Sequence, residues 1–215
     1  MATGVAAVAV AALLAACGGG SSSDANERAG TYDVRVTEAA FPSEQRLGQT
    51  SLMRLGVRNT GEETIPALTV TVSIAGKEGK SSSLPFGIRD PQPGLAQPYR
   101  PVWVLAQTYP RLAGSSEPGG TSTSNPKTFS FGALKPGKSV DAVWKLSAVR
   151  VGDYTVLYDI DAGLSSEVKA QTAGGVAPGG SFVTEISAAL PDVEVTDSGE
   201  VLEKKQQRQR PEPGE

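Results

Sequence analysis

The sequence predicts an all-β protein, an antiparallel β-sandwich of about seven to nine strands with two long loops. Two observations support this prediction. From Thr31 onward, apolar residues recur at every second position, which is typical of half-buried strands. The 25 glycines and 15 prolines are concentrated between these runs, and no segment between Thr31 and Leu190 carries a sustained helical stripe of apolar residues. Short alternating runs separated by turn residues favour a sandwich.

The alternating runs give the expected strands. The second and third runs are separated by residues 59–63 (NTGEE), which predict a turn and therefore a hairpin with one apolar face. The two expected long loops cover residues 75–101 and 110–126, with a short apolar run between them. The expected strands include residues 32–37, 53–58, 68–74, 140–146, 154–160, 167–172 and 181–186.

The N-terminal segment indicates export and attachment to a membrane. Residues 5–16 are apolar and uncharged, and they are fewer than the roughly 20 residues that a spanning helix needs. Their number suits the core of a signal peptide. The run ends in Leu14-Ala15-Ala16-Cys17, which resembles the lipobox of bacterial lipoproteins. The resemblance implies cleavage between Ala16 and Cys17 and a diacylglycerol on the Cys17 sulfur, so that the protein is extracytoplasmic and anchored to the cell membrane.

The predicted organisation follows from these segments. We expect a signal peptide over residues 1–16, a lipidated cysteine and a flexible Gly/Ser tether over 17–30, the sandwich over 31–190, and a largely disordered extension over 191–215. The tether sequence, GGGSSSDANERAG after Cys17, has almost nothing apolar to bury.

Composition excludes several classes of site. The chain has no histidine, which removes Ser-His-Asp catalysis and histidine-ligated metal sites. The single cysteine excludes disulfides within the chain and cysteine-rich metal centres. The chain has a net charge of -3, and its lysines and arginines are scattered through the expected sandwich. The sequence therefore predicts no basic surface for nucleic acid. We expect no cofactor.

Several short motifs resemble those of immunoglobulin-like modules in bacterial surface proteins, including CARDB-type adhesion-related and BsuPI-type proteinase-inhibitor domains. These motifs are VRNTG at 57–61, LKPGKS at 134–139, Trp144, and GDYTV at 152–156. The resemblance covers about residues 31–186 and implies the fold, with Trp144 and Tyr154 in the core and Tyr154 in the place of a tyrosine corner. It leaves the function open.

Three motifs could carry chemistry, and each has a structural alternative. GALKPGKS at 132–139 matches a phosphate-binding loop, but the following residues alternate as a strand, and Lys135-Pro136-Gly137-Lys138 suits a type II turn. We therefore expect no nucleotide. Ser166-Glu167-Val168-Lys169 matches S-x-x-K but lacks the helix and the other elements of penicillin-recognising enzymes. Asp159 and Asp161 share one strand face without the oxygen-rich loop that calcium needs.

The first long loop is the predicted partner-binding segment. Aromatic and arginine side chains in loops are common interface anchors, although they could equally cover an open edge of the sandwich. The candidate residues are Phe86, Arg89, Tyr99, Arg100 and Trp103.

The sequence thus predicts a non-catalytic binding, adhesion or structural module with an unidentified protein or cell-envelope partner. The main alternative is an accessory inhibitor or regulator of a secreted enzyme, and a Ser-Lys hydrolase is a third.

Overall fold

The structure is a computed structural model that describes residues 27–75, 81–83, 86–87, 101–188, 193–197 and 201–203. Within these ranges every regular element is a strand, as predicted, and no helix is long and apolar enough to cross a membrane. The strands are β1 (Gly30–Ala40), β2 (Glu44–Arg46), β3 (Thr50–Asn59), β4 (Thr69–Ala75), β5 (Ser81–Ser83), β6 (Phe86–Gly87), β7 (Trp103–Leu105), β8 (Arg111–Leu112), β9 (Thr121–Ser122), β10 (Thr128–Ser130), β11 (Ser139–Ala148), β12 (Gly152–Asp161), β13 (Val168–Gln171), β14 (Gly179–Ser187), β15 (Val193–Val195) and β16 (Val201–Glu203).

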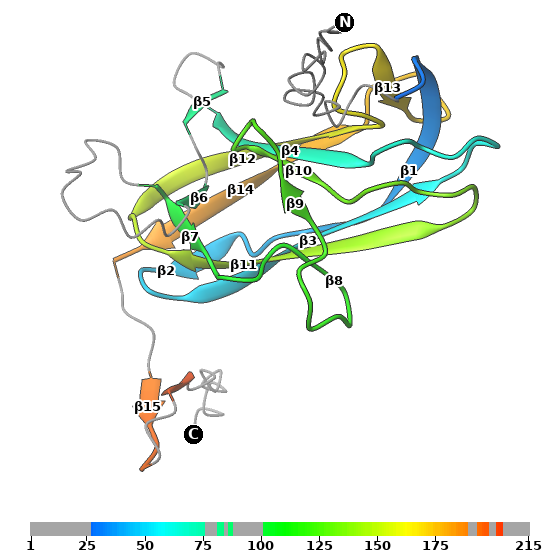
Figure 1. Cartoon of the computed structure of the whole chain (residues 1–215). Helices are drawn as coiled ribbons and strands as arrows, with labels where there is room; N and C mark the ends of the chain where they lie inside the picture. The colour runs from blue at the N-terminus through cyan, green and yellow to red at the C-terminus, as the bar shows by residue number, and fades with distance from the viewer. Residues whose placement is uncertain are drawn as a thin grey trace, which may run out of the picture.

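Two sheets pack face to face and form the predicted sandwich (Figure 1). The first sheet has the order β13-β1-β3-β11-β7-β6, with β8 also paired to β11, and the second has the order β2-β14-β12-β4-β10-β9, with β5 paired to β4. The long central strands pair antiparallel, whereas β13, β2 and β6 join their neighbours in parallel. Both sheets are therefore mixed, and short strands at their edges raise the number of strands above the seven to nine expected.

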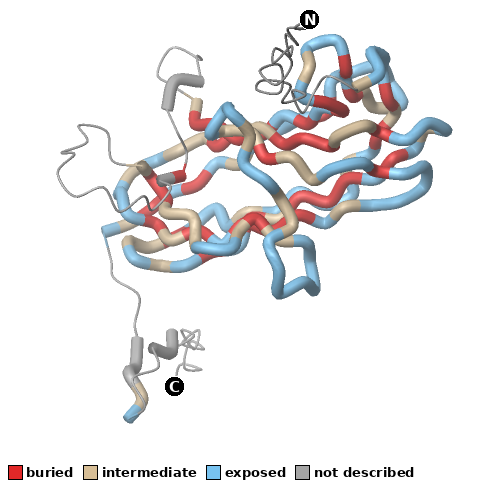
Figure 2. The backbone as a smooth tube through the Cα atoms, in the orientation of Figure 1, coloured by how far each residue is buried: buried red, intermediate tan, exposed pale blue. Residues whose placement is uncertain are grey.

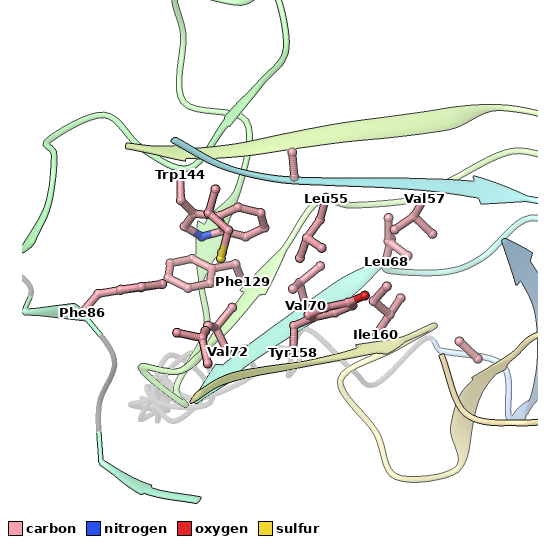
Figure 3. Close-up of a cluster of buried hydrophobic side chains, with 14 of the residues drawn as sticks. Leu55, Val57, Leu68, Val70, Val72, Phe86, Phe129, Trp144, Tyr158 and Ile160 are labelled. Carbon is pink, nitrogen blue, oxygen red and sulfur yellow. The ribbon is translucent and has the colours of Figure 1, made fainter. Parts of the chain in front are cut away.

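The apolar residues of the period-two pattern form the core. Buried and exposed residues alternate along the long strands of both sheets (Figure 2). Leu55 and Val57 of the first sheet face Val70 and Ile160 of the second (Figure 3). Full burial of such a side chain contributes about 1.5–3 kcal/mol, so these layers hold the sandwich together.

The expected hairpin between the second and third runs is wrong. β3 pairs with β1 and β11 in the first sheet, whereas β4 pairs with β12, β10 and β5 in the second. Residues 60–68 cross from one sheet to the other. Ile65 and Leu68 in this crossover have no exposed surface, and Ile65 bridges to Leu134. The segment is therefore an apolar crossover that closes one end of the core, and not the solvent-exposed turn that the sequence predicts.

The GALKPGKS segment forms the predicted turn. Lys138 N donates to Lys135 O at 3.1 Å, and Gly137 has a φ of 70°, a left-handed conformation that glycine adopts without strain. β11 begins at Ser139, immediately after the turn. The helix that a phosphate-binding loop requires is absent from this described segment.

Asn59 ties this turn to the crossover. Its buried side chain donates from Nδ2 to Glu63 O and Leu134 O, both at 2.8 Å, and its Oδ1 accepts from Gly61 N at 3.0 Å. Its backbone N–H donates to Lys138 O at 2.9 Å, and its carbonyl accepts from Gly137 N at 3.0 Å. The side chain therefore joins the crossover to the Leu134 carbonyl, and the Asn59 backbone joins the end of β3 to the turn.

Tyr154 forms the predicted tyrosine corner. Its hydroxyl donates to Val151 O at 2.9 Å, a bond to the backbone a few residues upstream. Its ring packs edge-on against Trp103 with centroids 5.7 Å apart. Trp144 is fully buried in the core, as expected, whereas Tyr154 is partly buried and packs against the core.

The predicted C-terminal extension contains a two-stranded antiparallel ladder. β15 and β16 pair through Val193↔Glu203, Glu194↔Leu202 and Val195↔Val201.

Candidate functional site

The predicted partner-binding loop is only partly described, and its described members are buried. Phe86 and Trp103 are 5% and 0% exposed, and both belong to the core. Trp103 donates from Nε1 to Gln45 Oε1 at 2.9 Å. These two residues therefore pack inside the sandwich and are not interface anchors. Arg89, Tyr99 and Arg100 lie outside the described residues, as do Ala16 and Cys17.

A groove lined mainly by hydroxyl side chains is the candidate site. It has a volume of about 810 Å³ and lies along β4, β10 and β9. The loop between β12 and β13, residues 162–167, covers it and is called the groove-covering loop. β9 and β10 extend the second sheet beside β4 (Figure 1). The lining residues are Thr69, Thr71, Thr121, Ser122, Thr123, Ser124, Asn125, Thr128, Ser130, Asp161, Gly163, Leu164, Ser165, Ser166, Val168, Lys169, Ala170 and Ala177.

Strand alternation places the hydroxyls at this groove. Val70 and Val72 of β4 enter the core, so Thr69 and Thr71 point to the opposite face of the sheet. Thr71 and Thr128 are cross-strand partners whose hydroxyl oxygens are 2.8 Å apart. Thr69 is 2% exposed and donates to Gly163 O at 3.2 Å. The floor of the groove is thus held in place by hydrogen bonds to the strands and to the covering loop.

A tight turn forms one rim. Thr123 Oγ1 donates to Asn125 O at 3.0 Å and accepts from Asn125 N at 3.1 Å. Asn125 Oδ1 in turn accepts from Lys127 N at 3.1 Å. These local bonds replace the regular strand pattern and give the rim a defined shape.

The opposite rim is fastened to the beginning of the described chain. The Glu27 carboxylate accepts from Leu164 N and Ser165 N at 2.9 Å. A Cβ on Gly163 would come within 2.6 Å of Glu27 Oε2 and of the Val168 Cβ, so only glycine fits there. Gly30 N also donates to Glu167 O at 3.0 Å. The segment that enters β1 is therefore bound to the groove-covering loop.

Two charged residues line the groove. Desolvation raises the pKa of Asp161, and Asp159 two residues away raises it further, while the Ala170 backbone N–H and the Lys169 charge lower it. Asp159 and Asp161 do share one strand face, as predicted. The described residues contain no group of three or more acidic or cysteine side chains that could hold a metal ion. One acid and one base within a hydroxyl lining suit a polar, uncharged ligand.

The S-x-x-K motif also lies at the groove, but it lacks the arrangement of a catalytic pair. Ser166 and Lys169 both line the wall and are exposed. Lys169 lies on strand β13, and among the described residues no hydrogen bond joins Ser166 Oγ to Lys169 Nζ. Nothing in this geometry removes the hydroxyl proton, which nucleophilic catalysis requires.

Replacing Asp161 with asparagine is expected to raise stability at neutral pH. Because the folded pKa is raised, the charged form costs stability above that pKa, and the cost disappears as the pH falls through it. Solvent screening keeps the effect small. Urea denaturation from pH 3 to pH 7 should show that the wild type loses stability relative to Asp161→Asn as the pH rises above the ordinary value of 3.8. Asp153→Asn on the same strand is the control, and equal behaviour of the two variants would contradict this assignment.

Comparison of the sequence with protein-family models and with curated proteins gives no match. Among solved structures, the chain is similar to the CARDB domain of the PF1109 protein from Pyrococcus furiosus. The crystal structure of that domain, in complex with di-metal ions, gives 12% identity and a TM-score of 0.37 over 73% of this chain and 89% of that one. Its solution structure gives 12% identity and a TM-score of 0.40 over 72% and 94%.

A further similar structure is that of native alpha-2-macroglobulin from Escherichia coli, from domain MG7 to the C-terminus. The identity is 16% and the TM-score 0.40, over 75% of this chain and 17% of that one. With such low identities and TM-scores, these structures assign no site or ligand to this chain.

Sequence reasoning missed the groove. The strand residues of the groove are the polar half of an alternating pattern. The same pattern occurs on any strand whose outer face is solvated, so it does not distinguish a groove. The unusual density of threonine and serine at residues 121–130, close in space to Thr69 and Thr71, is the signal that was available. Bringing these segments together requires the pairing of β4 with β10, which no local pattern encodes.

Proposed function

We propose that this chain is a membrane-anchored extracytoplasmic lipoprotein whose sandwich binds a cell-envelope partner without catalysis. The anchoring rests on the lipobox-like Leu14-Ala15-Ala16-Cys17 at the end of an apolar run. The binding role rests on one structural observation, the hydroxyl-lined groove of about 810 Å³. The lack of a hydrogen bond between Ser166 and Lys169 among the described residues supports binding rather than hydrolysis.

The length of the tether supports a position of the groove near the membrane. Nine residues lie between Cys17 and Glu27, so the path is ten residue steps long, and Glu27 is bound to the groove-covering loop. Fully extended, such a segment reaches about 33–36 Å, and a flexible Gly/Ser chain of this length spans about 16–19 Å on average. A lipidated Cys17 would therefore keep this end of the sandwich close to the lipid surface.

The lining indicates the chemistry of the partner. Serine and threonine hydroxyls both donate and accept hydrogen bonds, and Asp161, Lys169 and Asn125 add directional polar groups. The hydroxyl-rich lining and the near balance of charge suit an extended polyhydroxylated chain, such as a glycan strand of the cell envelope. A large apolar partner would leave these hydroxyls unpaired, at a cost in binding. A strongly ionic partner would meet no excess of opposite charge, because the lining holds one acid and one base.

Site-specific photocrosslinking in cells tests this proposal. Thr121 is exposed at the groove and pairs with Ser130, whereas Ser181 is an exposed residue of the same sheet outside the groove. A photoreactive amino acid at position 121 should give a defined adduct, and one at position 181 should not. Adducts of the same kind at both positions, or at neither, would contradict binding in the groove.

A further inference from the structure

A second hollow lies on the outer face of the first sheet, at the middle of β1 and the end of β3. It has a volume of about 620 Å³ and is lined by Arg35, Thr37, Arg58, Asn59, Thr60, Gly61 and Gly137. None of these residues lines the hydroxyl groove. The hollow is therefore a separate feature, and its two charged lining residues are both arginines.

The two arginines are placed opposite each other by the strand register. Arg35 of β1 and Arg58 of β3 are Cα partners in the antiparallel ladder, so their side chains leave the same face of the sheet. Directly opposite residues have Cβ atoms about 4.5–5.5 Å apart, and like charges in such a pair destabilise the sheet. Both side chains are exposed. An anion bound between them would attract both charges and offset their mutual repulsion.

Nearby carboxylates do not neutralise this pair. Asp33 lies on the same face of β1 as Arg35, but its Oδ1 accepts a hydrogen bond from Gln171 Nε2 at 2.8 Å. Glu38 and Asp141 flank Gly56, which lies two residues before Arg58 on β3. Among the described residues, none of these carboxylates forms an ion pair with either guanidinium. Neither guanidinium at the hollow thus has an ion-pair partner in the described part of the chain.

We infer that this hollow binds a phosphate oxyanion between the Arg35 and Arg58 guanidinium groups. Each guanidinium presents parallel N–H donors that match two oxygens of a phosphate. The Thr37 and Thr60 hydroxyls at the lining add neutral donors to the remaining oxygens. The Asn59 hydrogen bonds hold the wall next to Arg58 in place. This inference goes beyond the proposed function, because it does not depend on lipidation or on the groove.

Two sources could supply the phosphate, a lipid headgroup or a soluble phosphorylated molecule. The test uses the full chain with Cys17→Ser, so that no acyl chain contributes to membrane binding. Inorganic phosphate is titrated while the arginine side-chain N–H resonances are followed by NMR. In parallel, the chain is sedimented with phosphatidylglycerol vesicles and with phosphatidylcholine vesicles.

Arg35→Gln and Arg58→Gln are the test variants, and Arg54→Gln on the same strand, outside the hollow, is the charge-matched control. We expect phosphate to shift the Arg35 and Arg58 resonances, and we expect at least a tenfold weakening in each test variant with little change in the control. Removing one of two like charges should leave the melting temperature unchanged or higher, so loss of binding would not reflect unfolding.

The outcomes separate the sources. Phosphate binding without selective binding to anionic vesicles identifies a soluble ligand, and arginine-dependent binding to phosphatidylglycerol vesicles identifies a lipid headgroup. Absence of both kinds of binding, or equal weakening in Arg54→Gln, would overturn the inference. An unlipidated Cys17 in cells would contradict the proposed anchoring but leave this result unaffected.

Discussion

Replacing Asn59 with alanine is expected to lower the free energy of unfolding by about 2–3 kcal/mol, because three side-chain hydrogen bonds are lost at about 1 kcal/mol each. Two of the partners keep another bond, since Leu134 O still accepts from Ile65 N and Gly61 N still donates to Asp33 O. This limits the expected loss. Urea denaturation of the wild type and the variant measures it.

Two further variants isolate the cause. Asn59→Asp has nearly the same shape but replaces the donor with a carboxylate that faces two carbonyl oxygens, so it should be at least as destabilising as Asn59→Ala. Asn125→Ala removes only an exposed turn bond to Lys127 N and should cost less than Asn59→Ala. If Asn59→Ala and Asn125→Ala have the same stability, the Asn59 side chain does not join the crossover to the Leu134 carbonyl.

The same substitution at the two buried tryptophans is expected to have different effects. Trp103 and Trp144 are both 0% exposed. Trp103 Nε1 donates to the buried Gln45 Oε1, whereas Trp144 Nε1 has no partner among the described residues. Trp103→Phe therefore leaves a buried acceptor unpaired, which costs about 1–3 kcal/mol. Trp144→Phe removes an unpaired donor and keeps the edge-to-face contacts with Phe129 and Phe131.

Both variants lose similar volume, so the difference in their free energies of unfolding measures the Trp103–Gln45 hydrogen bond. We expect Trp103→Phe to be the less stable by about 1–3 kcal/mol in thermal or urea denaturation. The reverse order would show that the polar contact is not maintained in the core.

The strands could be predicted because alternation is a local property of the chain. Residues 53–58 and 140–146 are β-strands in the structure for the same reason that they alternate in the sequence: one face packs in the core. Alternation does not encode which strand pairs with which. The hairpin over residues 53–74 was expected because NTGEE is turn-like, whereas buried Ile65 and Leu68 make the segment a crossover between sheets.

The candidate site could not be predicted for a related reason. The groove combines β4, β10 and the loop before β13, which are far apart in the chain. The Arg35–Arg58 pair likewise depends on the register of β1 against β3. By contrast, the turn at residues 135–138 was predicted correctly, because proline fixes φ and glycine permits positive φ, and both effects are local.

Mass spectrometry of the protein isolated from its own cells tests the central claim, a sandwich held at the membrane by a lipid. The account predicts a chain that begins at Cys17 and carries a diacylglycerol on the cysteine sulfur. It also predicts that Cys17→Ser moves the protein from the membrane fraction to the soluble fraction, since the two acyl chains of the diacylglycerol supply the attachment. An unmodified Cys17 thiol, or an N-terminus at another residue, would contradict it.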